Sequence, residues 1–150
     1  MLEPTKVLRD LIKRVLRLND NEALFFITDL SIVQDFIIDL NTHEQLFKKG
    51  IGSTGLELPT YSQVSQDLFG KPDRAFTLND TGDFYNTFEV IPTKKGYFLI
   101  IADGQKEDEN ILKKYSEFEV VGLTEDSQDK LATFMGQFVN DYIRETLNIQ

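Results

Sequence analysis

The chain has 150 residues, enough for one domain, and 41% hydrophobic and 27% charged residues are typical of a folded globular protein. It contains no cysteine and only one histidine, His43, so disulfides, thiolate metal sites and zinc sites built from several histidines are excluded. A formal net charge of −9 argues against a protein that binds nucleic acid over its whole surface. No apolar run approaches the roughly 20 residues that cross a bilayer, and no signal-peptide pattern is present, so we expect folding in a cytoplasm without membrane contact.

Residues 4–18 are predicted to form an amphipathic helix, with Pro4 at its first position. Residues 1–18 carry five basic and two acidic side chains, whereas the rest of the chain carries 11 basic and 23 acidic ones. This asymmetry predicts a docking face for an acidic partner or for DNA phosphate, although a solvated face on a core-packed helix would show the same pattern. The basic face comprises Lys6, Arg9, Lys13, Arg14 and Arg17, and the residues expected to pack on the body are Val7, Leu11, Val15 and Leu18.

A second helix is predicted over residues 21–40, with Asp20 or Asn21 as its N-cap. It carries two apolar stripes, so we expect it to be covered on two sides, either by the first helix or by a neighbouring subunit.

Residues 50–83 contain several glycines and prolines, which predict a long connection with an extended loop at about 50–80. A short helix over 62–69, capped by Ser62, is the only regular element expected within it. Long connections of this kind in small domains are usually functional. A lone loop can hardly bury large apolar side chains, so we expect those in this segment to be ordered by a neighbouring subunit. These candidate interface residues are Leu56, Leu58, Leu68 and Phe69.

Residues 86–103 are predicted to form a β-hairpin that turns at Thr93–Gly96, and a strand near 118–121 is expected to join it. A short helix is expected over 108–116. A last helix, over about 125–147, is expected to begin at a Thr124 cap with two acidic residues in its first turn.

The expected architecture is therefore a single α+β domain over residues 1–150. N-terminal helices precede a small antiparallel sheet centred on hairpin 86–103, and the C-terminal helix packs on that sheet. The side chains expected to share one core are Phe88, Val90, Phe98, Ile100, Phe134 and Phe138.

Asp80-Thr81-Gly82 matches the tripeptide of aspartic proteases, in which two aspartates share a proton. Val120-Val121-Gly122 even resembles the downstream apolar element of those enzymes. The surroundings differ, because Asn79 precedes the aspartate where an apolar residue is usual, and Asp83 follows the glycine where a small residue is usual. The alternative interpretation is that Asp80 or Thr81 caps a turn of helix over 82–87.

The other chemistry-bearing residues form no catalytic or cofactor set. His43 has no paired nucleophile, and Glu107-Asp108-Glu109 lacks the spacing of a calcium loop. The glycines at 50, 52 and 55 lack the lysine of a phosphate-binding loop. We therefore expect no enzyme activity, no cofactor and no metal.

Between Asp39 and Glu125 several short elements follow one another in a recognisable order. They are Asp39-Leu40-Asn41, Glu44-Gln45-Leu46-Phe47, Lys49-Gly50-Ile51, Gly55, Tyr61-Ser62, Gly70-Lys71-Pro72, Thr77 to Tyr85, Phe88, Val90 and Gly122-Leu123-Thr124. In this order they resemble phage virion-morphogenesis and head–tail joining proteins (neck and tail-completion proteins), especially those of phages and prophages of Bacteroidetes. In such proteins a Thr-Gly pair leads into a β-strand, which here corresponds to Thr81-Gly82 and Phe88. The basic helix lies outside the resemblance.

The resemblance implies a non-enzymatic structural protein of the virion, a ring or connector subunit between portal and tail. Its partners would be further copies of itself and other portal, neck or tail proteins, and its location the virion, with the host cytoplasm during assembly. Two alternatives stay open: a dimeric aspartic protease that uses Asp80, and an acidic phage-encoded binding protein that mimics nucleic acid.

Overall fold

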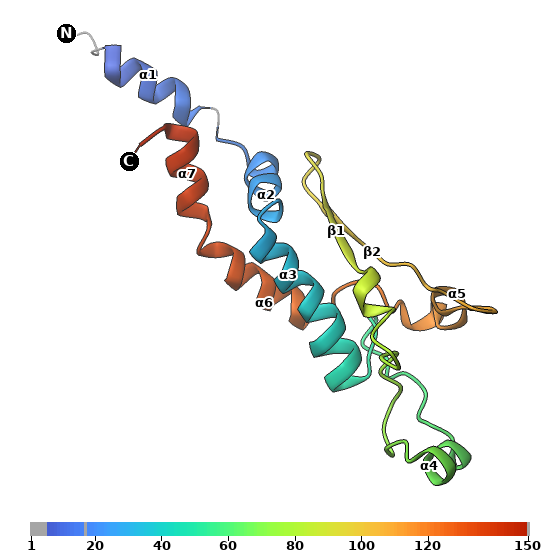
Figure 1. Ribbon diagram of the computed structural model, residues 1–150. Helices are drawn as coiled ribbons and strands as arrows, with labels where there is room; N and C mark the ends of the chain where they lie inside the picture. The colour runs from blue at the N-terminus through green and yellow to red at the C-terminus, as the bar shows by residue number, and fades with distance from the viewer. Residues whose placement is uncertain (1–5, 17, 150) are drawn as a thin grey trace.

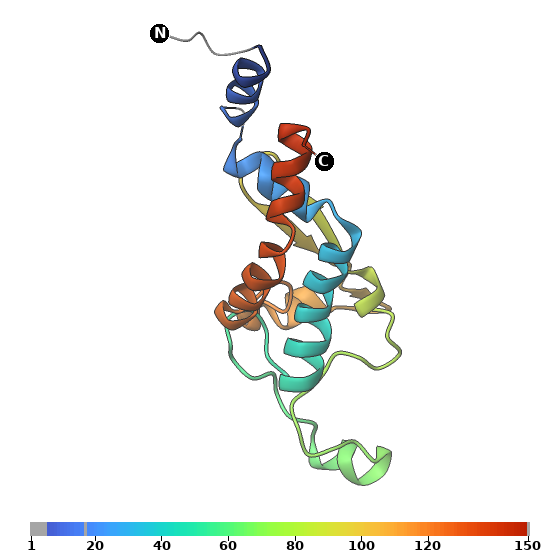
Figure 2. The ribbon, with the colours of Figure 1, turned by 90° about the vertical axis from the view of Figure 1, so that its left-hand side faces the viewer.

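The computed structural model describes residues 6–16 and 18–149, without the side chains of Lys6, Val7, Leu8, Leu11 and Lys13. Helices combine with two antiparallel two-stranded sheets, which confirms the α+β class. The molecule is elongated, with helix α1 (Lys6–Val15) at one end and helix α4 (Gln63–Phe69) at the other (Figures 1 and 2). In the described residues no helix has the length and apolar character needed to span a membrane.

The predicted helix over 21–40 is present but broken and longer than expected. Helix α2 (Asp20–Thr28) is capped by Asn19, which lies one residue before the first predicted cap. The Asn19 side chain accepts a hydrogen bond from the Asn21 amide at 2.8 Å. Leu30 then adopts an extended conformation, and helix α3 (Ser31–Asp39) starts behind it. The π-helix η1 (Leu40–Lys49) continues α3 for another ten residues.

The predicted hairpin is confirmed. Strand β1 (Glu89–Pro92) pairs with β2 (Phe98–Ile101), with Val90 opposite Ile100, and Gly96 lies in the turn at a φ of 87° that glycine adopts without strain. A second, smaller sheet joins β3 (Gln105–Lys106) and β4 (Glu109–Asn110).

The predicted strand near 118–121 is wrong, and within the described residues the hairpin pairs with no third strand. Two fully buried amide side chains of η1 take the hydrogen bonds that a strand would have made. Asn41 donates to the Val120 carbonyl at 2.9 Å and accepts from the Gly122 amide at 2.7 Å. Gln45 donates to the Gly122 carbonyl at 2.8 Å and accepts from the Thr124 amide at 2.9 Å. The two amides lie four residues apart on η1 and bind backbone groups two residues apart, so they serve successive positions of residues 120–124. We call this arrangement the amide ladder.

The predicted helix over 108–116 is shorter in the structure. Its first residues belong to β4, and Asn110 caps helix α5 (Ile111–Lys114) by accepting from the Lys113 amide at 3.1 Å. The 3-10 helix η3 (Ser116–Phe118) follows. The predicted helical turn over 82–87 is reduced to the 3-10 helix η2 (Tyr85–Thr87), whose N-cap position is Phe84 and has no side-chain cap; Thr81 accepts a bond from the Asp83 amide at 3.4 Å in the turn before it.

The C-terminal helix begins where predicted but is divided in two. Thr124 caps α6 (Glu125–Gly136) by accepting from the Ser127 amide at 3.2 Å. The helix ends at Gly136, and α7 (Val139–Leu147) starts in a new direction (Figure 1). Val139, the first residue of α7, is exposed at this bend.

The core consists of two clusters of buried side chains, and Ile38 and Ile100 pack against both. The first is centred on Leu46, Leu58, Phe84, Tyr85, Phe88, Ile111, Tyr115 and Val120. The second joins α2, α3, β1 and α6 through Ile27, Val33, Ile37, Leu40, Val90, Leu123 and Leu131, with Phe98, Phe134 and Phe138 packed against it. Val90, Phe98 and Ile100 therefore share a core with Phe134 and Phe138 as predicted, whereas Phe88 belongs to the other cluster.

Candidate interaction surfaces

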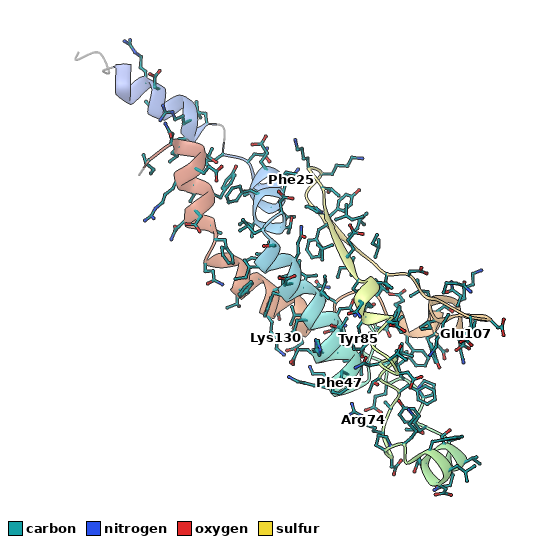
Figure 3. All side chains as sticks on the ribbon, viewed as in Figure 1. Phe25, Phe47, Arg74, Tyr85, Glu107 and Lys130 are labelled. Atoms are coloured by element: carbon teal, nitrogen blue, oxygen red, sulfur yellow. The ribbon has the colours of Figure 1, made fainter. Side chains whose placement is uncertain are left out.

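The long connection is anchored at its base and exposed at its tip. An isolated bridge between Thr60 and Ala75 closes a projecting segment, residues 60–75, which we call the finger. The Arg74 guanidinium donates to the Phe47 carbonyl at the end of η1 and lies 5.5 Å from the Phe47 ring (Figure 3). This contact ties the base of the finger to the π-helix.

Leu58 is the one interface candidate of this connection that the structure contradicts. Only 2% of its surface is exposed, and it lies in the first core cluster beside Leu46. Its own subunit buries it because the chain folds back beside η1, where the Leu58 amide donates to the Gly50 carbonyl at 2.7 Å.

The tip of the finger carries an uncovered apolar face. No residue of α4 is buried, and Leu68 and Phe69 are 72% and 73% exposed. Val64, one helical turn before Leu68, is exposed as well. Ser62 caps this helix as predicted, accepting from the Ser65 amide at 3.2 Å. Leu56 is also exposed, but it lies before the finger.

Helix α1 is a second projection. Arg14 donates to the Leu147 carbonyl at 2.8 Å, which fixes α1 to the end of α7. The expected packing of Val15 and Leu18 on the body is wrong: both are exposed, because α1 extends past α7 instead of lying along the core (Figure 2). Arg9 is also exposed. The side chains of Lys6, Val7, Leu11 and Lys13, and the whole of Arg17, lie outside the described part of the chain.

Asp80, the candidate protease aspartate, is held by two ammonium groups. Lys71 Nζ and Lys106 Nζ each lie 3.5 Å from one of its carboxylate oxygens. The charge of Lys71, and then that of Lys106, lowers the pKa of this carboxyl. It lines a hollow of about 160 Å³ together with Thr81 and Ile111. In an aspartic protease, two carboxyl groups face one another and share a proton. The two lysines beside Asp80 instead favour its ionised form.

A groove of about 780 Å³ runs between α6 and the junction of α3 with η1. Its floor is apolar, with the rings of Phe36 and Phe134 stacked at 4.1 Å between centroids and Leu40 beside them. Its rim is mostly acidic and comprises Asp39, Glu44, Asp126 and Asp129, with Lys130 as the one basic side chain lining it. We call this the acidic groove; Lys130 marks its position in Figure 3.

Ion pairs hold much of the rim in place. Asp126 lies 3.0 Å from Lys130 Nζ and 3.2 Å from Lys49 Nζ, and these hydrogen bonds lower the pKa of its carboxyl. Glu44 pairs with Lys48, and this hydrogen bond lowers the pKa of Glu44. His43 Nδ1 lies 2.9 Å from Asp39, although His43 itself does not line the groove. The lowered pKa values favour the ionised form of Glu44 and Asp126.

A further apolar surface lies on the hairpin. The side of β1–β2 that faces away from the helices exposes Ile91, Leu99 and Ile101. Next to it, β2 and α6 enclose a groove of about 460 Å³ whose lining includes Leu131 and Met135. Neither this groove nor the acidic groove was predicted. For the acidic groove, a signal was available in the spacing of Phe36, Leu40 and Glu44, and of Asp126 and Asp129, which lie on common helical faces.

In the described residues no group of three or more histidine, cysteine, aspartate or glutamate side chains is arranged to hold a metal ion. The surfaces that could bind another protein are the finger, α1, the acidic groove and the exposed side of the hairpin. Comparison of the chain with protein families, with curated proteins and with solved structures finds no match.

Proposed function

We propose that this chain is a non-enzymatic structural protein of a bacteriophage virion, a ring or connector subunit in the neck or tail-completion region that joins head to tail. The observation that carries the proposal is the finger, whose exposed Val64, Leu68 and Phe69 project far from the core. A lone monomer gains nothing from such a face, whereas each side chain of this kind stabilises an interface by about 1.5–3 kcal/mol when fully buried.

The shape of the subunit supports the same role. A closed ring of identical subunits uses two different surfaces, one for each neighbour. Here the finger and α1 project from opposite ends of the molecule, so one subunit can reach two others (Figure 1). The lysines that neutralise Asp80 support a non-enzymatic role over the protease alternative. The order of sequence elements between Asp39 and Glu125 adds the assignment to the neck region.

The test uses the phage or prophage that encodes the chain. Mass spectrometry of purified particles should detect the protein, and deletion of its gene should leave heads and tails unjoined in electron micrographs. Wild-type protein supplied in trans should restore joined particles, whereas the double variant Leu68→Ser, Phe69→Ser should not.

Val139→Ser is the matched control, because Val139 is also an exposed apolar residue but lies on α7. Both variants should keep the thermal midpoint of the wild type, since only exposed side chains change. Joined, infectious particles that lack the protein would overturn the proposal.

A further inference from the structure

Helix α1 is amphipathic, and its own subunit leaves the described side chains of its apolar side uncovered. Ile12 and Val15 are exposed, and so is Leu16, the residue after the helix, to 79%. The helix contacts the body through α7, where Arg14 binds the Leu147 carbonyl, and it projects beyond that point (Figures 1 and 2). From Lys6 to Val15 it carries four basic residues and one acidic residue. A helix of this composition fits a surface that is both apolar and negatively charged.

The acidic groove is such a surface. Its floor of Phe36, Leu40 and Phe134 offers apolar contact, and its lining carries four acidic side chains against one lysine. With Lys48 and Lys49, which pair with Glu44 and Asp126, the rim keeps one net negative charge, and the segment Lys6 to Val15 carries three net positive charges. By contrast, the groove between β2 and α6 has no charged side chain in its lining. Charge complementarity therefore selects the acidic groove for α1.

We infer that α1 of one copy docks into the acidic groove of a second copy, with its apolar side on the aromatic floor and its basic residues against the rim. The inference rests on the proposed ring role and deepens it, because it names the contact between neighbouring subunits. A helix and a groove are different surfaces, so the contact is head-to-tail.

The position of α1 favours a second copy over the subunit's own groove. Arg14 holds α1 at the C-terminal end of α7, and the nine residues of α7 span about 13 Å before α6 is reached. The own groove lies past that length, between α6 and α3 (Figure 1). Each copy has a net charge of −9, so two copies repel one another unless opposite charges meet locally. The basic α1 on the acidic rim provides that local attraction.

The experiment uses the purified full-length chain and two charge-reversed variants. The first carries Arg9→Glu and Lys13→Glu on α1, and the second carries Asp39→Lys and Asp129→Lys on the groove rim. Sedimentation velocity should show self-association of the wild type that weakens as NaCl rises from about 0.05 to 0.5 M. Each variant alone should associate at least about tenfold more weakly. An equimolar mixture of the two should associate again, because each supplies one intact surface and the two reversed surfaces are also complementary.

Zero-length cross-linking of lysines to carboxylates identifies the contact. With mixed ¹⁴N- and ¹⁵N-labelled chains, cross-links from Lys6 or Lys13 to Asp39, Asp126 or Asp129 should join differently labelled copies. Cross-links within one copy only, a wild type that stays monomeric at low salt, or a mixture that fails to associate would overturn the inference. The inference would also be overturned in favour of DNA binding if the wild type does not self-associate but binds duplex DNA in a salt-dependent manner, and the α1 variant loses this binding.

These outcomes separate the inference from the proposed function. A chain that is present in virions but lacks the α1–groove cross-link refutes only the inference. A chain that self-associates through α1 but is absent from joined particles refutes only the neck role.

Discussion

Replacing Gln45 by leucine tests the amide ladder directly. Gln45 is fully buried, and its amide serves both the Gly122 carbonyl and the Thr124 amide. Leucine fills similar space but has no polar atoms, so the buried Thr124 amide and the partly buried Gly122 carbonyl both lose their partner. An unsatisfied buried group costs about 1–3 kcal/mol, so Gln45→Leu should lower the free energy of unfolding by about 2–5 kcal/mol. For a domain of this size, the thermal midpoint should fall by roughly 4–20 °C.

Urea denaturation followed by circular dichroism measures this loss. Gln66→Leu is the matched control, because Gln66 donates one hydrogen bond, to the Tyr61 carbonyl at 2.9 Å, from a partly exposed position. The control should lose less than about 1 kcal/mol. The reasoning fails if Gln45→Leu is no more destabilising than the control, since water or a rearranged backbone would then satisfy Gly122 and Thr124.

Three further predictions concern other positions. Leu58→Ala should destabilise the fold by about 2–4 kcal/mol in the same assay, whereas Leu68→Ala should leave it unchanged; equal losses would contradict the division into anchored base and exposed tip. Gly52→Ala should prevent stable folding, judged by chemical-shift dispersion, because a Cβ atom there would lie 1.8 Å from the Phe118 carbonyl oxygen; a well-dispersed spectrum would contradict this. The Asp80 carboxyl should titrate below its ordinary pKa, and Lys71→Ala should raise that pKa in an NMR titration. The pKa of Asp80 is lower in the folded state than in the unfolded state. Asp80 therefore stabilises the fold at neutral pH, by less than about 1 kcal/mol at this exposed site, and this contribution is lost as pH falls through the folded-state pKa.

Local signals predicted the elements that depend on local chemistry. Ser62 and Thr124 cap helices because their hydroxyls accept from amides three residues ahead, and this interaction needs no distant partner. The hairpin follows from its turn residues and its apolar strands. Of the hairpin side chains predicted to share a core with Phe134 and Phe138, three do so, Val90, Phe98 and Ile100, whereas Phe88 lies in the other cluster.

The remaining features depend on contacts between distant segments. Residues 118–121 have the composition of a strand, but the side chains of Asn41 and Gln45, 77 to 81 residues away, bind the backbone groups of Val120 and Gly122. In the sequence, Leu58 lies in a long loop and therefore suggests an interface residue. In the fold it is buried in one cluster with Leu46 of η1. The acidic groove forms only when α6 packs against α3, so its members are scattered in the sequence.

The amide ladder has a consequence for how the sequence can diverge. Where two strands pair through their backbones, most side chains can be exchanged without loss of the hydrogen bonds. In this protein one partner uses side chains, so positions 41 and 45 accept only residues with both a donor and an acceptor at the right reach. The side chains of Val120 and Val121 take no part in these hydrogen bonds and are free of that demand. Related chains should therefore keep amides at 41 and 45 while their counterparts of Val120 and Val121 vary among apolar residues.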